Sequence, residues 1–242
     1  MTIVSASSPR RSQSASAASP SFTTAVYDVL GVRVGIEADA SAIALIDRSY
    51  GGFRASDRDP TRWLSMSGVR SGTEALRAIE GGDDALSSAL DLLHELVVVI
   101  MAGLLERGLY AVHAGAVARG DAALMLAGPG GAGKTTLTLA LVARGFEVLS
   151  DELAVIDPES QTVLPYRRNV HVRPGTPELV DGLGRLVDRP RERLGGGIAW
   201  AVPQADLGAG ADDVAPRRLA GVILLQPRDP SLHAPSIAPV RS

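Results

Sequence analysis

Residues 122–137 read AALMLAGPGGAGKTTL, which is an apolar run, a glycine-rich loop and the start of a second apolar run. The loop fits G-x-x-x-x-G-K-[ST] at each defined position, from Gly128 to Thr135. The first run has the composition of a buried strand, and residues 134–143 are predicted to form a helix closed by Gly145. Because strand, loop and helix come in the order that a phosphate-binding loop requires, we predict an α/β fold with a P-loop. A glycine-rich turn without a ligand is the alternative.

The residue types of this loop suit a bound phosphate. Glycines let successive backbone N–H groups turn toward an anion, and the N-terminus of the following helix adds a favourable dipole. Lys134 would neutralise the β and γ oxygens of a nucleotide, and Thr135 would offer its hydroxyl to Mg²⁺. The residues predicted to bind ATP and Mg²⁺ are therefore Gly128, Gly130, Gly131, Ala132, Gly133, Lys134, Thr135 and Thr136.

Lys134 is also the single lysine of the chain, since the other 23 of its 24 basic residues are arginines. Arginine has replaced lysine wherever a diffuse positive charge suffices. A compact ammonium fits between phosphates where a planar guanidinium does not. The retained lysine therefore indicates a position where geometry matters as well as charge; the alternative is that the single lysine falls there by chance.

Two acidic residues follow the next predicted strand, residues 146–149. These are Asp151 and Glu152. The carboxyl ends of strands in an open α/β sheet border one crevice, so both side chains are expected to face the phosphates. There a carboxylate can hold Mg²⁺ or accept a proton from a substrate hydroxyl. The predicted metal ligands are thus Thr135, Asp151 and Glu152; a helix cap or turn aspartate is the alternative.

A histidine, His113, lies within residues 109–118, which are predicted to form the strand before the loop strand. This run is too apolar to explain a histidine by surface exposure. A buried neutral histidine bonded to the backbone is one interpretation, and a catalytic histidine is the other. The candidate catalytic residues are Asp151, His113 and Lys134.

The remaining elements are predicted from hydrophobic spacing and turn residues. Strand-like runs on both sides of Gly31 indicate a hairpin or a bent strand within residues 25–38, and residues 85–107 have helical spacing up to Gly108. Helices are also predicted at 42–47 and 72–79, and strands at 62–66, 169–172 and 219–225, the last of which is expected to be buried. Residues 153–156 are predicted to form a hairpin with 162–165, and residues 205–216 a loop. No element is predicted between 182 and 204.

Composition excludes several classes of function. The chain of 242 residues is 45% hydrophobic and 21% charged with a net charge of −3, and its interspersed charges leave no basic stripe for nucleic acid. The absence of cysteine excludes disulfides and thiol nucleophiles. The longest apolar run, residues 96–105, is about half of a membrane span. Residues 1–20 lack the apolar segment of a signal peptide, so we expect a disordered leader, no membrane partner and a cytoplasmic location.

The spacing of these motifs resembles that of a known family. His113 stands fifteen residues before Gly128, the loop reads GPGGAGKTT, residues 143–145 read ARG, and the acidic pair begins twenty-three residues after Gly128. Over residues 110–174 this pattern resembles the catalytic domain of HPr kinase/phosphorylase and its relatives, which phosphorylate a protein or peptide serine. Thr135 and Thr136 stand where that family usually has Ser-Glu, and Glu152 stands where it has a second aspartate.

The resemblance implies a P-loop kinase domain of the HPr kinase type, with a mixed β-sheet and flanking helices, over residues 109–242. A small α+β region, 21–108, would precede it, after the leader. In that family the first acid is the base toward serine and the acid in the reverse reaction, with the histidine nearby; these roles would fall to Asp151 and His113. Arg173, near the end of the matched residues, would be able to reach phosphate or substrate; a solvated surface position is the favoured alternative. The chain ends before the family's C-terminal helices, so we expect a domain shortened at that end.

The leading hypothesis is therefore an ATP- and Mg²⁺-dependent kinase, a phosphotransferase that transfers the γ-phosphoryl group to a serine hydroxyl of a protein or peptide. A nucleotide-binding switch or scaffold with little catalysis is an alternative from another class. A small-molecule kinase differs only in its acceptor. A homo-oligomer is compatible with the sequence.

Overall fold

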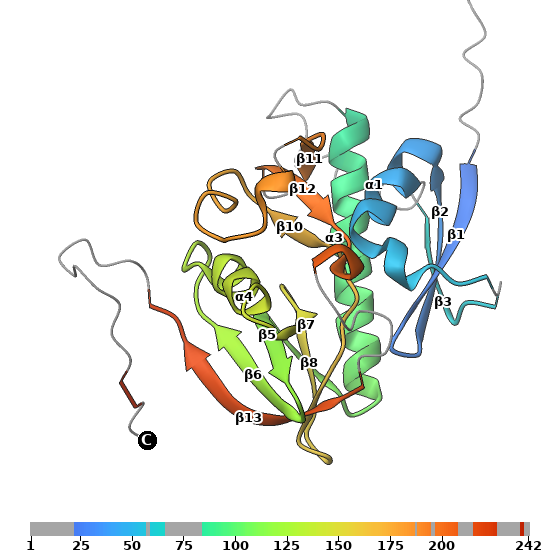
Figure 1. Cartoon of the computed structure of the whole chain (residues 1–242). Helices are drawn as coiled ribbons and strands as arrows, with labels where there is room; N and C mark the ends of the chain where they lie inside the picture. The colour runs from blue at the N-terminus through green and yellow to red at the C-terminus, as the bar shows by residue number, and fades with distance from the viewer. Residues whose placement is uncertain are drawn as a thin grey trace, which may run out of the picture.

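The computed structural model describes residues 22–56, 59–65, 84–186, 188–194, 197–207, 215–226 and 238–239. The predicted leader and the predicted helix at 72–79 lie outside these residues. Within them the chain is mixed α/β, with few helices and one large mixed sheet (Figure 1). The predicted α/β class is confirmed at this level. No helix in these ranges has both the length and the apolar character needed to cross a membrane.

The N-terminal sheet is built on the predicted hairpin. Strands β1 (Phe22–Val29) and β2 (Val32–Asp39) pair antiparallel, and β3 (Arg62–Ser65) adds to β2 in parallel. The turn places Gly31 at φ +84, a backbone conformation that glycine adopts without strain. Helix α1 (Ala40–Tyr50) begins where the Asp39 carboxylate accepts the N–H of Ala42 at 2.9 Å. It extends the predicted helix at both ends.

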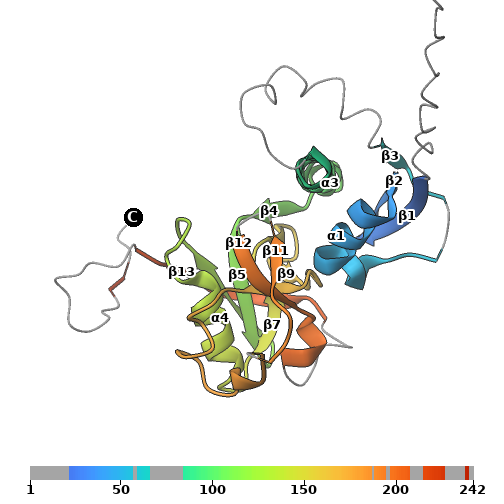
Figure 2. The same cartoon turned by 90° about the horizontal axis from the view of Figure 1, so that it is seen from above.

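Helix α3 (Asp84–Glu106) confirms the predicted long helix and ends before Gly108, at φ +76. Leu92, Leu96, Ile100 and Leu104 recur every four residues and are fully buried. Viewed along its axis, α3 stands between the N-terminal sheet and the large sheet (Figure 2). The largest core cluster surrounds it and joins residues of β1, β2 and α1 to four later ones, namely Leu153, Val155, Tyr166 and Ala199.

The large sheet has the order β4-β8-β9-β13-β6-β5-β7. Only β13 and β6 run parallel; the other neighbouring pairs are antiparallel. Helix α4 (Lys134–Val142) connects β6 to β7, and β5 lies between these two strands. The strands are β4 (Tyr110–Val112), β5 (Ala114–Arg119), β6 (Ala122–Ala127), β7 (Glu147–Ser150), β8 (Ala154–Asp157), β9 (Thr162–Leu164) and β13 (Arg217–Leu224).

One interruption in this sheet differs from the prediction. Residues 109–118 were expected to form one strand, but the chain breaks at His113 into β4 and β5. β4 pairs with β8 and β5 pairs with β7, and a hydrogen bond of 3.1 Å from Ala114 N to Glu152 O lies at the level of the break. The segment β4–β5 and the segment β7–β8 are therefore interrupted at the same height in the sheet, and His113 is placed opposite the acidic pair.

The third sheet lies beside α4 and consists of β10 (Val170–Val172), β12 (Gly197–Val202) and β11 (Glu192–Leu194), all antiparallel. No strand was predicted after residue 182 in this part, so β11 and β12 were missed. Strand β13 was predicted to be buried, but its residues alternate, and Val222 and Leu224 are 45% and 49% exposed. Short 3-10 helices occur at Gly184–Leu186 and Gln204–Leu207, the second one partly within the predicted loop.

Candidate functional site

The glycine loop is shaped by its neighbours on both sides. Leu225 N donates to Ala127 O at 2.7 Å at the end of β6, and a Cβ on Gly128 would lie 2.7 Å from Leu225 O. Gly131 and Gly133 adopt φ values of +79 and +91. Glycine is therefore required at Gly128 by close approach of the backbone and at the other two positions by conformation.

Lys134 is the first residue of α4 and is 8% exposed. Its ammonium donates to the carbonyls of Gly128 at 2.9 Å and Pro129 at 3.2 Å, so the side chain folds under the loop. Its charged end thus lies against the loop whose amides would bind phosphate. This is the place that the motif predicted.

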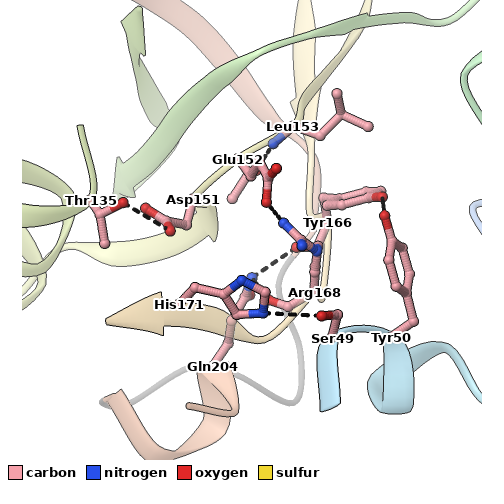
Figure 3. Close-up of polar contacts among 11 residues, drawn as sticks. Ser49, Tyr50, Thr135, Asp151, Glu152, Leu153, Tyr166, Arg168, His171 and Gln204 are labelled. Carbon is pink, nitrogen blue, oxygen red and sulfur yellow. Dashed lines mark hydrogen bonds and ion pairs between the residues drawn. The ribbon is translucent and has the colours of Figure 1, made fainter. Parts of the chain in front are cut away.

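Thr135 and Asp151 meet at the base of the loop. The Thr135 hydroxyl donates to Asp151 Oδ2 at 3.1 Å, as Figure 3 shows. Asp151 Oδ1 is buried and has no hydrogen-bond partner among the described residues. Burial raises the pKa of Asp151 from 3.8 to about 6, against the opposing effects of the Thr135 hydrogen bond and the Arg168 and Lys134 charges. A desolvated carboxylate with one free oxygen is a good proton acceptor and a good ligand for a hard cation.

Glu152 does not turn toward Thr135 as expected for a shared metal site. It forms an ion pair with Arg168, whose side chain is 12% exposed while that of Glu152 is 47% exposed. The guanidinium carbon of Arg168 also lies 5.5 Å from the ring centroid of Tyr50, which belongs to α1. Sequence reasoning missed Arg168, because no motif marks an arginine between two short strands.

His113 opens onto the same site. Its side chain is exposed, so neither the expectation that the apolar run hides it nor the interpretation as a buried histidine is correct. The break between β4 and β5 turns it out of the sheet. Partial burial lowers its pKa, and the positive charges of Lys134 and Arg168 lower it further. His113 is therefore neutral at pH 7 and able to accept a proton or a hydrogen bond.

A second histidine at the site was not predicted. His171 on β10 lies with Nε2 at 3.0 Å from the hydroxyl of Ser49 in α1. Burial lowers its pKa to about 3, assisted by Arg168 and Arg173, so it is neutral. Arg173, the candidate from the resemblance, is exposed at the wall of the pocket. The spacing from Ser49 to His171 is too long for any sequence signal.

Most of the predicted site residues line one pocket of about 750 Å³, within the range of small-molecule sites. Gly128 and Ala132, which were also predicted to bind ATP, are not among the residues that line it. One side carries the loop, the acidic pair, His113 and Arg168. The other side was not predicted and consists of one face of α3 and the segment after β10, with Leu90, Leu93, His94, Val97, Arg173, Pro174, Gly175, Thr176 and Leu179. The pocket therefore combines a polar end beside the glycine loop with a largely apolar wall.

No group of three or more histidine, aspartate or glutamate side chains among the described residues is arranged to hold a metal. The donors present are the Thr135 hydroxyl and the Asp151 carboxylate, both hard oxygen ligands. Mg²⁺ commonly binds through one or two protein groups together with substrate phosphates and water. The residues thus fit a Mg²⁺ that arrives with a nucleotide. No known protein family matches the chain, and no curated protein shows significant similarity to it.

Proposed function

We propose that the protein is an ATP- and Mg²⁺-dependent kinase of the HPr kinase type, which transfers the γ-phosphoryl group to a serine hydroxyl of a protein or peptide. The observation that carries this proposal is the contact of Thr135 Oγ1 with Asp151 Oδ2 at 3.1 Å beneath the glycine loop. It joins the hydroxyl suited to Mg²⁺ with a buried carboxylate whose second oxygen is free.

The loop would bind the phosphates through its backbone N–H groups and Lys134. The Lys134 ammonium already lies under the loop, 2.9 Å from Gly128 O, so it needs little movement to reach an oxygen of a bound phosphate. Mg²⁺, when bound, supplies charge neutralisation at the β and γ phosphates. Thr135 and Asp151 are the residues that would hold it.

Asp151 would also accept the proton of the attacking hydroxyl. The serine oxygen forms a bond to the γ phosphorus, the bond from that phosphorus to the bridging oxygen of ADP breaks, and the hydroxyl proton passes to the Asp151 carboxylate. A pKa of about 6 keeps the carboxylate ionised at pH 7 while making it more basic than an exposed aspartate. His113, neutral and beside the acidic pair, would orient the acceptor hydroxyl.

The test is incubation with Mg·ATP and serine-containing peptides, followed by mass spectrometry. We expect a phosphoserine product, and we expect Lys134→Arg to lower kcat by about 100-fold or more, because a guanidinium cannot take the place of the ammonium under the loop. Arg189→Lys, in an exposed ion pair with Asp206, is the matched control and should leave kcat unchanged.

Two outcomes would contradict the proposal. Steady ATP hydrolysis without phosphate gain by any peptide would favour the nucleotide-binding switch. Near-normal transfer by Lys134→Arg would show that charge alone suffices at this position.

A further inference from the structure

Arg168 has no part in the mechanism above, although it lines the same pocket as the glycine loop. It lies between β9 and β10 with a side chain only 12% exposed. A guanidinium stays charged in proteins, and burial to this degree requires its charge and its donors to be compensated. The contacts of Arg168 therefore indicate what it is placed to bind.

The protein compensates Arg168 only in part. Nη1 is paired with Glu152, and the ring of Tyr50 lies 5.5 Å from the guanidinium carbon. The Nε–H is buried and has no acceptor among the described residues. One side of the fork is thus engaged by a carboxylate, while donor capacity remains for an additional anionic oxygen.

The backbone around Arg168 is fixed from two directions. Gln204 Nε2 donates to the carbonyl of Tyr166 at 2.8 Å and to that of Arg168 at 3.0 Å. On the other side, Asn169 N donates to Ser49 O at 2.9 Å, and the Asn169 side chain donates to Arg48 O at 2.8 Å. Arg168 is therefore held in place before any ligand binds, which lowers the entropic cost of a contact.

The charge of Arg168 acts at the point where the phosphoryl group would be transferred. The positive charges of Lys134 and Arg168 both lower the pKa of Asp151 and the pKa of His113. Arg173 lines the same pocket but is exposed. Phosphoryl transfer spreads negative charge over three oxygens, and a second cation beside the lysine stabilises that charge.

We propose that Arg168 binds the oxygens of the γ-phosphoryl group as a second cation beside Lys134, with Tyr50 as its positioning residue. The ligand class is a nucleoside triphosphate, as distinct from a diphosphate. This inference rests on the nucleotide site of the proposed function.

The test is isothermal titration calorimetry with Mg·AMP-PNP and Mg·ADP, which gives the ratio of the two Kd values for each variant. We expect Arg168→Gln to lower the preference for the triphosphate, measured as the Kd for Mg·ADP divided by the Kd for Mg·AMP-PNP, by at least about tenfold. The Kd for Mg·ADP itself should change by less than about twofold. Arg168→Lys, which keeps a charge to pair with Glu152, should lose a smaller part. If Arg168→Gln does not unfold cooperatively, the ratio measured for Arg168→Lys is used to test the proposal.

Two matched controls separate this role from general destabilisation. Arg217 resembles Arg168 because its side chain is mostly buried, is paired with a glutamate and has an unpartnered Nε among the described residues. It is the first residue of β13, whose other end lies beside the glycine loop. Arg217→Gln should keep the wild-type ratio. Tyr50→Phe retains the ring and should also keep it, whereas Tyr50→Leu removes the ring and should lower it.

An unchanged ratio in Arg168→Gln and Arg168→Lys, in proteins that still bind both nucleotides, would overturn the inference. Equal losses for Mg·AMP-PNP and Mg·ADP would do the same, since they would assign Arg168 to the fold of the pocket. The ratio does not depend on any acceptor, so these results are distinguishable from a failure of the kinase proposal, in which wild-type protein binds nucleotide and phosphorylates no peptide.

Discussion

At the residue scale, burial of the Asp151 carboxylate destabilises the folded chain at neutral pH. Its carboxylate is hydrated in the unfolded chain and desolvated in the folded one, which is why its pKa rises to about 6. Below about pH 4 the carboxyl is protonated in both states and costs nothing. The free energy of unfolding falls as the pH rises from about 4 to 6, because the folded state still binds the proton in this range. Above that range the loss of stability is constant.

We therefore predict that Asp151→Asn raises the free energy of unfolding by about 1–3 kcal/mol at about pH 8 and by almost nothing at about pH 4, while transfer is lost. Urea unfolding at the two pH values measures this. Asp157→Asn is the control of opposite sign, because hydrogen bonds from Ser160 lower the pKa of Asp157 and its carboxylate is favoured in the folded state. Equal midpoints for Asp151→Asn and wild type at about pH 8 would contradict the prediction.

The residues of the site differ in how well the sequence predicts them. Lys134, Thr135 and Asp151 are found from local spacing, because a strand, a loop and one helix place them together. Arg168 and Tyr50 are not, since their contact joins segments more than one hundred residues apart that meet only when the core around α3 is formed. Long-range packing leaves no periodic pattern in the chain.

At the element scale, α4 packs very closely on β5 at Gly115. A Cβ there would lie 2.6 Å from Thr138 Oγ1. Gly115→Ala is expected to lower the free energy of unfolding by about 1–3 kcal/mol, and Thr138→Ala in the same chain should recover part of the loss. Gly51→Ala is the control, with open space around it and an ordinary φ of −54, and should be neutral or slightly stabilising. The measurement is the denaturant midpoint of each variant. A midpoint of Gly115→Ala equal to that of the wild type would show that α4 moves freely away from the sheet.

Elements were predicted where their own residues specify them. The β1–β2 hairpin, α3 and the β8–β9 hairpin carry turn residues or a long apolar stripe. Strands β11 and β12 do not, because β11 has only three residues, glycines separate the two strands, and both are defined by pairing with each other or with β10. The break at His113 was also missed, since an apolar run looks the same whether or not its partner strand is interrupted.

At the scale of the whole molecule, the core around α3 unites the N-terminal sheet with residues of β8, β12 and Tyr166. The two tryptophans lie in different sheets: Trp63 is 57% exposed on β3, and Trp200 is buried on β12 in a separate cluster, with Nε1 donating to Arg189 O at 3.0 Å. We predict that in Trp63→Phe and in Trp200→Phe, each of which leaves one tryptophan as the reporter, the fluorescence transition has the same urea midpoint as the far-UV circular dichroism transition of the same variant. Separate midpoints would show two independently unfolding units.

The hydrogen bond from Leu225 to Ala127 has a consequence for biosynthesis. The glycine loop gains its final support from a strand made almost one hundred residues after it, and that strand joins β6 in parallel. Such non-local pairing forms slowly. Until β13 has been synthesised, the glycine loop (residues 128–133) therefore lacks this backbone contact, and a nascent chain that ends before β13 carries the loop without its support.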